Sequence, residues 1–262
     1  MITLLTDFGT ADYFIPAVKG VIFSINPGAS IVDLTHEIAP QDLHSGAFTL
    51  GASYPYFPPG TIHVAVVDPG VGSERRAIVV ETPRALFVGP DNGIFTYVYA
   101  REDVRRVYHI QRVEFCRPVI SPTFHGRDVF APVAAWLSRG VPPRQIGEEI
   151  DDFISLPLAT PRIEPSTGIV HGRIIHLDRF GNCITNLTAH DLPPREAKGK
   201  ILRVAGQKVS QFGEYYGQAE RKEELFAYPG SAGYWEIALW CGSAAARLAV
   251  ASGTPLTLEP EN

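Results

Sequence analysis

Residues 62–70, IHVAVVDPG, hold the pattern that decides the fold: an apolar run ends at an aspartate and is closed by a glycine. The pattern recurs at residues 2–9, ITLLTDFG, and at residues 86–93, LFVGPDNG. A short apolar run bounded by turn residues is typical of a strand that is buried on both faces, as strands of a parallel sheet are. We therefore expect three such strands, each followed by an aspartate. These aspartates are Asp7, Asp68 and Asp91.

Amphipathic segments alternate with these apolar runs along the first half of the chain. Their periodicity predicts helices over residues 13–26, 41–54 and 128–139, and a proline or glycine follows each of them. Two further strands are predicted at 31–34 and 77–81. Strands that alternate with helices in this way predict an α/β domain, with a largely parallel sheet covered by helices on both faces.

The pattern changes after residues 156–168, LPLATPRIEPSTG, which contain three prolines. Beyond them, strand patterns predominate and few segments of helical period remain. The strands are predicted at 169–177, 201–204, 234–240 and 255–258. We therefore expect an α/β domain over residues 1–155, a linker over 156–168, and a smaller, β-rich domain over 169–262.

The composition is that of a globular protein and excludes several classes. Hydrophobic residues make up 45% of the chain and charged residues 19%, which excludes a disordered chain. A net charge of −5 argues against a nucleic-acid partner. Because no segment approaches about 18 uninterrupted apolar residues, no membrane partner is expected. The three cysteines lie far apart, which favours a reducing compartment, the cytoplasm.

Motifs for several common chemistries are missing from the sequence. GVG at 70–72 is not a GxGxxG dinucleotide motif, and neither a P-loop nor a GxSxG nucleophile motif occurs. Three histidines and two aspartates could be imagined as a metal site, but their spacing matches no compact ligand pattern. They are His36, His44, His63, Asp42 and Asp68. The sequence therefore disfavours dinucleotide binding, P-loop ATPase activity, acyl transfer and a bound metal.

The three strand-terminal aspartates and one histidine are the candidates for chemistry. Ligands of open α/β sheets bind outside the carboxyl ends of the strands, so three aspartates there favour a site. An aspartate before glycine is also ordinary turn chemistry, and that interpretation stays open for each of them. His125, in TFHGRDVFAP, stands just before a predicted helix. It either caps the turn or acts as a general base or an orienting group.

Several motifs that occur in order carry a resemblance to one family. They are LLTDFG at 4–9, VVDPGVGSERR at 66–76, GPDNGIF at 89–95, FHGRD at 124–128, LDRFGNCITN at 177–186 and SAGYWEIAL at 231–239. Together they resemble the S-adenosylmethionine (SAM) hydroxide adenosyltransferases, which are relatives of the SAM-dependent fluorinase and chlorinase. Each motif alone means little, but the ordered set spans nearly the whole chain and is highly specific.

The resemblance implies a reaction, an assembly and three catalytic residues. The implied reaction converts SAM and water to adenosine and L-methionine, without a metal or another cofactor. The implied assembly is a homotrimer with active sites between neighbouring subunits. Asp68, Arg75 and His125 match the family's water-activating residues, and the choice between Asp68 and His125 as proton acceptor stays open.

The resemblance also implies a set of substrate contacts. Asp7 matches the residue that binds the ribose diol, Asn182 the residue that reads adenine, and Asp178 the acid that holds the methionine ammonium. The other implied contacts are the aromatic residues Phe124 and Phe180 and the C-terminal residues Tyr228, Ser231 and Glu236. One departure is Trp240-Cys241, where the family suggests more polar residues near the adenine.

Two other functions remain as alternatives. In the halogenases, the family resemblance suggests the motif Tyr-Pro-x-Thr-Gly at the place where this chain has Asp68-Pro-Gly-Val-Gly72. It also suggests a tyrosine at the position of His125. A carboxylate at residue 68 would repel a halide ion, which disfavours halogenation. The second alternative is a non-catalytic sensor that binds adenosine or SAM.

Overall fold

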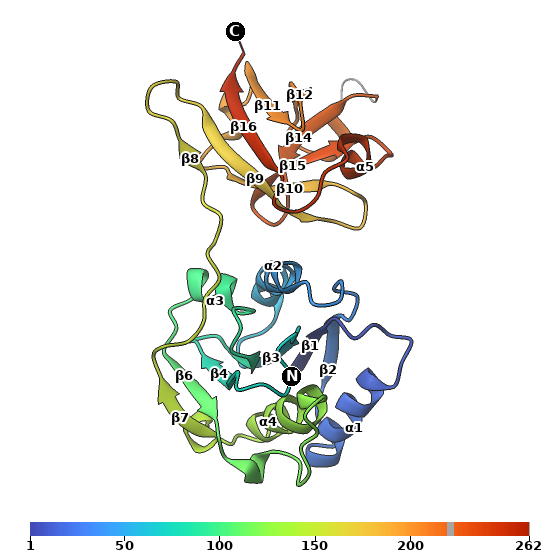
Figure 1. Cartoon of the computed structure of the whole chain (residues 1–262), viewed down its shortest axis with the longest axis vertical. Coiled ribbons are helices and arrows are strands. Elements are labelled where there is room, and N and C mark those ends of the chain that lie inside the picture. The colour runs from blue at the N-terminus through green and yellow to red at the C-terminus, as the bar shows by residue number, and fades with distance from the viewer. Residues whose placement is uncertain (219–222, 262) are drawn as a thin grey trace. The chain divides into compact units, whose positions relative to one another are not determined.

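The computed structural model describes residues 1–218 and 223–261, which form two compact units, residues 1–157 and 158–262 (Figure 1). The division falls inside the proline-rich segment 156–168. Within that segment, strand β8 (Arg162–Ile163) pairs with the first long strand of the second unit. Each unit has a hydrophobic core of its own.

The first unit is a seven-stranded sheet between two layers of helices (Figure 1). Its strands are β1 (Ile2–Thr6), β2 (Ile31–Thr35), β3 (Thr61–Val66), β4 (Ala77–Glu81), β5 (Ala85–Pro90), β6 (Arg106–Ile110) and β7 (Gly147–Ile150). Its α-helices are α1 (Phe14–Ile25), α2 (Leu43–Ser53), α3 (Thr96–Arg101) and α4 (Ala131–Ser138). The strand order is β2-β1-β3-β5-β4-β6-β7.

The sheet is largely parallel, as predicted. Strands β2, β1, β3 and β5 pair in parallel, whereas β4 pairs antiparallel with β5 and β6, and β7 pairs antiparallel with β6. Five of the seven strands therefore run in one direction. Strand β4 is reversed because only residues 82–84 connect it to β5, and a parallel crossover needs about a dozen residues or more.

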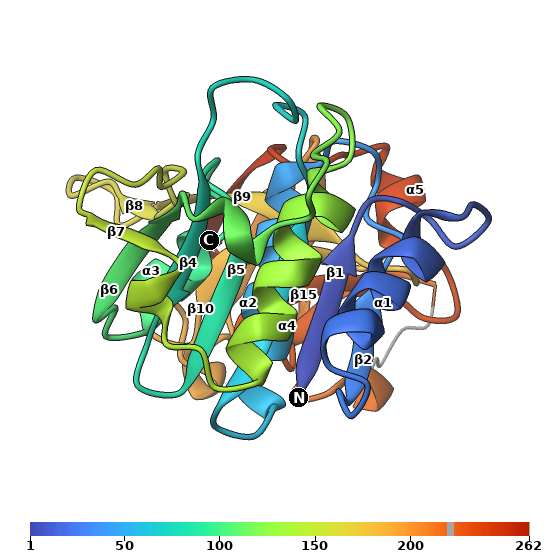
Figure 2. The ribbon, with the colours of Figure 1, turned by 90° about the horizontal axis from the view of Figure 1, so that it is seen from below.

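Helices cover both faces of this sheet, which explains the continuous apolar runs. Helices α1 and α4 pack on the face that includes Leu4, and α2 and α3 pack on the face that includes Leu5. Figure 2 shows α1 and α4 in front of the sheet and α2 behind it. All five residues of β1 are buried, since both of its faces are covered.

The predicted helices of this unit are confirmed within one or two residues, and three elements are additional. The third predicted helix begins as a turn of π-helix, Gly126–Phe130, that continues into α4. Helix α3 and strands β6 and β7 were not predicted. They have only four to six residues, too few for a clear hydrophobic period.

The second unit is a nine-stranded sheet in the order β12-β11-β16-β9-β10-β15-β14-β13, with β8 added beside β9. Its longer strands are β9 (Val170–Leu177), β10 (Cys183–Thr188), β11 (Lys200–Val204), β14 (Leu225–Pro229), β15 (Tyr234–Leu239) and β16 (Pro255–Pro260). Its shorter elements include β12 (Gln207–Val209), β13 (Gln211–Phe212), the helix α5 (Ala244–Leu248) and two 3-10 turns, Pro194–Glu196 and Tyr216–Gln218. The predicted β-rich character is thus confirmed.

Strand β10 was missed because polar residues interrupt its sequence, CITNLT. Thr185 is fully buried, and its hydroxyl donates to the carbonyl of Trp235 at 2.8 Å. Asn186 is buried as well, and its amide donates to the carbonyl of Ala159 at 3.0 Å. These hydrogen bonds satisfy the polar groups, so the strand lies in the core despite its composition.

Candidate functional site

Asp68 and Arg75 form a buried, two-point ion pair at the carboxyl end of β3. Arg75 Nε donates to Asp68 Oδ1 at 2.9 Å, and Arg75 Nη2 donates to Asp68 Oδ2. The side chains are only 5% (Asp68) and 9% (Arg75) exposed. The guanidinium also lies over the ring of Phe130, 5.3 Å from its centroid. A planar guanidinium bound through two donors fixes the orientation of the carboxylate as well as its position.

His125 completes this group from another loop. Its Nδ1 lies 2.9 Å from Arg75 Nη2. Because arginine has donors only, Nδ1 must accept, which leaves the single proton of the neutral imidazole on Nε2. Burial lowers the pKa of His125, and the positive charge of Arg75 lowers it further, so the neutral form is favoured. In this arrangement the second ring nitrogen of His125, Nε2, carries a hydrogen and can donate a hydrogen bond. The carboxylate oxygens of Asp68 can accept one.

The two loops that carry these residues meet because of a glycine. Gly72 has φ +78°, and a Cβ at this position would lie 2.2 Å from the carbonyl oxygen of Pro122. The loop that follows β3 therefore packs directly against the backbone just before His125. No other residue type combines this backbone conformation with so close an approach.

A second ion cluster holds the loop of His125 from the other side. The carboxylate of Asp128 is fully buried and accepts two hydrogen bonds from Arg127, at 2.7 and 2.8 Å, and one from the backbone N–H of Ser121 at 2.9 Å. Arg117 approaches the same carboxylate at 3.1 Å. Arg127 in turn lies over the ring of Phe124. In the FHGRD motif, Arg127 and Asp128 thus hold the loop in place, and Phe124 and His125 line the cavity described next.

The predicted residues of the first unit line one cavity of about 390 Å³. Asp7 contributes from the end of β1, Asp68 from the end of β3, and Phe124 and His125 from the loop before the π-helix. Arg75 is not among the residues that line the cavity, and it acts there through its hydrogen bonds to Asp68. The cavity wall also includes Phe8, Phe14, Pro40, Gln41, Val71 and Thr123.

Asp91 shares the sheet edge but has a structural role. It is 2% exposed, accepts from Arg76 Nε and Nη2 at 3.0 and 2.7 Å, and accepts from the backbone of Ile154 at 2.7 Å. Arg76 also binds Asp152. Asp91 therefore joins segments far apart in the chain through an ion pair and a backbone hydrogen bond, and it does not line the cavity.

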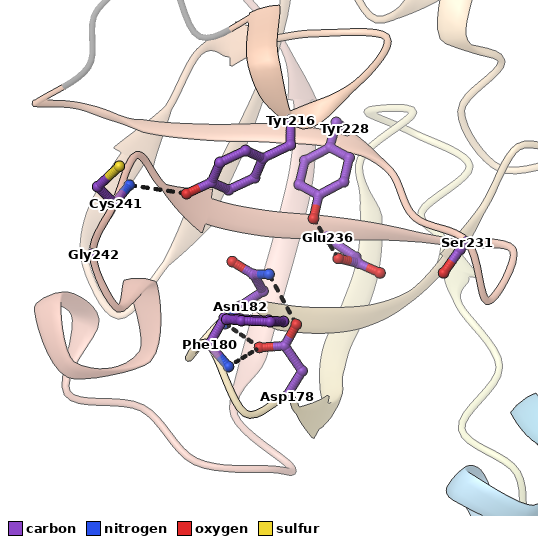
Figure 3. A pocket seen from close by; sticks show the side chains of 9 residues that line it. All are labelled: Asp178, Phe180, Asn182, Tyr216, Tyr228, Ser231, Glu236, Cys241 and Gly242. Carbon is purple, nitrogen blue, oxygen red and sulfur yellow. Dashed lines mark hydrogen bonds between the residues drawn. The ribbon is translucent and has the colours of Figure 1, made fainter.

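The predicted residues of the second unit line a different pocket, of about 780 Å³. They are Asp178, Phe180, Asn182, Tyr228, Ser231 and Glu236. Figure 3 shows Tyr216 and Tyr228 on one side of this pocket and Phe180, Asn182 and Asp178 on the other. Phe180 is 78% exposed, an unusual state for a large aromatic side chain.

Asp178 and Asn182 form a closed turn with one unused acceptor. Asp178 Oδ1 accepts from the backbone of Phe180 and of Asn182, at 2.9 and 2.8 Å, and Oδ2 accepts from the Asn182 side-chain amide at 2.8 Å. These bonds orient Asn182, whose buried Oδ1 is without a hydrogen-bond partner. A buried carbonyl oxygen left unpaired beside a pocket is suited to a ligand N–H donor.

Glu236 gives the pocket a second carboxylate. Burial raises its pKa, the negative charge of Asp178 raises it further, and the hydrogen bond from Tyr228 opposes this shift. The Tyr228 hydroxyl donates to Glu236 Oε2 at 2.6 Å, and burial raises the pKa of Tyr228 as well. No lysine or arginine is among the described residues that line the pocket. The pocket is thus suited to a positively charged ligand group.

Sequence reasoning missed Tyr216, which belongs to a stretch with no clear period. Its ring stacks on Trp240 at 5.3 Å, and its hydroxyl donates to the carbonyl of Leu239 and accepts from the N–H of Cys241. Cys241 has φ 50°, so this hydrogen bond stabilises a strained turn. The Trp240-Cys241 departure therefore shapes the pocket through its backbone and through Tyr216.

The described residues contain neither a candidate metal cluster nor a helix able to span a membrane. Among residues 1–218 and 223–261, no group of three or more histidine, cysteine, aspartate or glutamate side chains could hold a metal ion. In that same part of the chain, no helix combines the length and the apolar character needed to cross a bilayer.

Comparisons with known proteins agree with the order of the motifs. Residues 2–147 match the SAM hydroxide adenosyltransferase N-terminal domain, and residues 172–257 match the C-terminal domain of the same name. A protein of Thermus thermophilus named (R)-S-adenosyl-L-methionine hydrolase is 40% identical, over 97% of each chain. A fluorinase of Actinoplanes is more distant, at 27% identity over 73% of each chain.

A solved structure extends this similarity to three dimensions. The crystal structure of an uncharacterized conserved protein from Thermotoga maritima is similar with a TM-score of 0.90 and 35% identity, covering 99% of this chain and 100% of that one. The two domain matches together cover most of the chain, and so does the alignment to the hydrolase. The chain therefore belongs to the SAM hydroxide adenosyltransferase family.

Proposed function

We propose that this protein hydrolyses S-adenosyl-L-methionine to adenosine and L-methionine. The observation that carries the proposal is the arrangement of Asp68, Arg75 and His125, which places a fixed carboxylate and an imidazole N–H at the cavity that Asp7 also lines. The relatives that are named as hydrolases of this substrate, at 34–40% identity, support the same reaction.

The chemistry needs an acceptor for a water proton and little else. In the substrate, C5′ is bonded to a positively charged sulfur, so the leaving group departs as a neutral thioether and needs no proton. The water oxygen forms a bond to C5′ while the C5′–S bond breaks and its electron pair stays on sulfur. The water proton passes first to Asp68, which the tautomer of His125 leaves as the acceptor, and then to solvent.

Arg75 and His125 have supporting roles in this scheme. Arg75 holds the Asp68 carboxylate in one orientation, and the His125 Nε2–H can donate to the attacking oxygen and so fix its lone pair toward C5′. Positioning of this kind contributes up to about 7–11 kcal/mol when the reacting atoms are held in line. Asp7 would hold the ribose hydroxyls and thereby the rotation of C5′.

The second pocket has the features that the rest of the substrate needs. A planar base fits between aromatic side chains, and the unpaired Asn182 Oδ1 can accept from an exocyclic amine. Asp178 and Glu236 provide negative charge for a ligand that carries an ammonium and a sulfonium group. The same charges, with Asp68, disfavour a halide ion, and the scheme requires no cofactor.

We propose further that the protein is a cytoplasmic homotrimer. Each active site would combine the cavity of the first unit of one subunit with the pocket of the second unit of its neighbour. The three cysteines are unpaired, which favours a reducing compartment. Sedimentation equilibrium of the purified protein measures the assembly, and the expected mass is three times that of the chain. A monomer at micromolar concentration would contradict the trimer.

A single assay tests the reaction against its alternatives. The protein is incubated with SAM, with and without fluoride or chloride, and the products are separated by chromatography. We expect adenosine and L-methionine in every case, at a rate that a chelator leaves unchanged. A 5′-halogenated adenosine would instead indicate a halogenase, and unchanged SAM at high protein concentration would indicate a sensor.

A further inference from the structure

The connection from β2 to α2 runs beside the loop that carries Asp7. This connection, residues 36–41, is called the strap here. The backbone N–H of Gln41 donates to Asp7 Oδ2 at 2.8 Å. Gln41 itself has φ 66°, a left-handed backbone conformation that residues other than glycine rarely adopt. Strained backbone at such a contact indicates that the contact is held in place by its surroundings.

The other end of the strap is anchored by His36. Its buried ring places Nδ1 3.0 Å from Thr6 Oγ1, and its carbonyl accepts from the N–H of Gly9 at 2.8 Å. His36 therefore contacts the residue before Asp7 and the second residue after it. Thr6 Oγ1 also accepts from the N–H of Phe8, so the hydroxyl hydrogen is free to bond to the imidazole.

A charged pair supports the far side of the His36 ring. Buried His36 Nε2 lies 3.1 Å from Asp33 Oδ1, close enough for charge interaction but without the geometry of a hydrogen bond, and Asp33 Oδ2 binds Lys19 of α1 at 2.6 Å. Interaction with Lys19 and His36 lowers the pKa of Asp33 against the opposing effect of partial burial. An ionised Asp33 favours a proton on Nε2 and leaves Nδ1 to accept from Thr6. A continuous row of contacts thus connects helix α1 with the loop of Asp7; it passes through Lys19, Asp33, His36 and Thr6.

We propose that His36 is a positioning residue for Asp7, and that the strap as a whole fixes the orientation in which the Asp7 carboxylate meets a ligand. The strap holds Thr6 and Gly9 on either side of Asp7, and the Gln41 N–H donates to one of the two carboxylate oxygens. A ligand diol then meets the remaining acceptor sites of the carboxylate in one orientation. If the loop that carries Asp7 were released, only a fraction of the molecules would hold the Asp7 carboxylate in the binding orientation. The apparent affinity for the nucleoside would fall by that fraction.

This inference rests on the proposed function, since it takes Asp7 as the residue that grips the ribose. The test compares His36→Ala with the conservative His36→Asn, whose amide oxygen can take the place of Nδ1. A buried histidine elsewhere on the sheet supplies the control. His63 makes the same type of bond, from Nδ1 to Thr3 Oγ1 at 2.7 Å, but contacts neither the strap nor residues 6–10 by any described hydrogen bond. His63→Ala therefore probes loss of a buried Thr–His bond without release of Asp7.

Adenosine binding by calorimetry and the KM for SAM are the readouts. We expect His36→Ala to raise the Kd for adenosine and the KM about 3- to 10-fold with a smaller change in kcat, and His36→Asn to restore most of this loss. His63→Ala is expected to lower the melting temperature and leave the adenosine Kd unchanged. A general loss of stability would affect both histidine variants alike.

A double-mutant cycle separates positioning from a structural role. In an Asp7→Ala background, His36→Ala should cause no further rise in Kd, because the group that it positions is gone. Equal losses with and without Asp7, or an unchanged Kd in folded His36→Ala, would overturn the inference. These outcomes rest on nucleoside binding, so they are distinct from failure of the proposed reaction, which would show as a wild-type protein that binds adenosine but releases none from SAM.

Discussion

Arg75 couples the geometry of Asp68 to that of His125, because one guanidinium serves both side chains. Its Nη2 reaches Asp68 Oδ2 and lies 2.9 Å from His125 Nδ1. This contact bears on which group accepts the water proton, a choice that the sequence leaves open. A neutral imidazole that accepts at Nδ1 carries its hydrogen on Nε2 and can only donate there, so the proposed scheme takes the carboxylate as the proton acceptor.

Changing either group should reduce turnover much more than binding. We expect Asp68→Asn and His125→Ala each to lower kcat by about 10²- to 10⁴-fold, because each removes a group that acts on the attacking water. Adenosine affinity, measured by calorimetry, should change little. Glu148→Gln, at an exposed carboxylate of β7, is the control and should behave as wild type. Full activity in both variants would refute the assignment.

The protonation of His125 should follow the charge of Arg75. Its pKa lies below the ordinary 6.5, because of burial first and Arg75 second. Removal of the charge in Arg75→Gln should therefore raise this pKa, which an NMR titration of the imidazole measures. An unchanged or lower pKa would contradict this.

The same shift predicts a pH dependence for the wild type. Since the unfolded chain takes up the proton at a higher pH than the folded protein, the stability due to neutral His125 is complete above pH 6.5. It decreases as the pH falls below that value toward the folded pKa. Turnover should fall at lower pH, as the pH passes through the folded pKa, because a protonated Nδ1 can no longer accept from Arg75. A pH–rate profile, measured beside chemical unfolding at each pH, checks both, and turnover lost already above pH 6.5 would contradict the assignment.

At the scale of elements, the loop after β3 depends on Gly72 for its contact with the His125 loop. Gly72→Ala introduces a side chain at φ +78° and a Cβ that would lie 2.2 Å from the Pro122 oxygen, so the two loops must separate. We expect a loss of stability of more than about 1–2 kcal/mol, the cost of the left-handed conformation alone, and a large loss of kcat.

Gly140 supplies the matched control for this substitution. It has φ +92° after α4, and a Cβ there would meet no atom within 4 Å. Gly140→Ala should therefore show the conformational cost in thermal or chemical unfolding while kcat stays at the wild-type value. If both variants lost stability equally and kept full activity, the loop contact would have no catalytic role.

At the scale of the whole molecule, each unit carries only part of the proposed set of substrate contacts. The first unit holds the reactive group and Asp7, and the second holds the aromatic and acidic pocket. In the proposed trimer each active site draws these parts from different subunits. Two variants that are inactive for different reasons should then complement each other.

The complementation experiment mixes Asp68→Asn and Asn182→Ala chains by co-expression. If subunits assort at random and each site is shared by two chains, about one quarter of the sites receive both intact parts, so about one quarter of wild-type activity should return. Each variant expressed alone is the control. No recovery in a verified mixed trimer would contradict shared sites.

Local sequence patterns were enough to predict the strand-end aspartates, the main helices, the β-rich second half and the family motifs. Local patterns carry this information, since a strand that is covered on both faces is apolar along its whole length. Elements of four to six residues, such as α3 and β7, have too few positions for a period. Strand β10 was missed because buried polar residues pair with distant groups.

The contacts of each polar residue, in contrast, followed from the three-dimensional arrangement of the chain. Asp7, Asp68 and Asp91 have the same local pattern, yet Asp91 is tied to Arg76 and Ile154 while the other two line the cavity. The tautomer of His125, the unpaired Asn182 oxygen and the strap behind Asp7 likewise depend on contacts between segments far apart in the chain. The charge and hydrogen bonding of a side chain are set by its neighbours in space, and local sequence does not specify those neighbours.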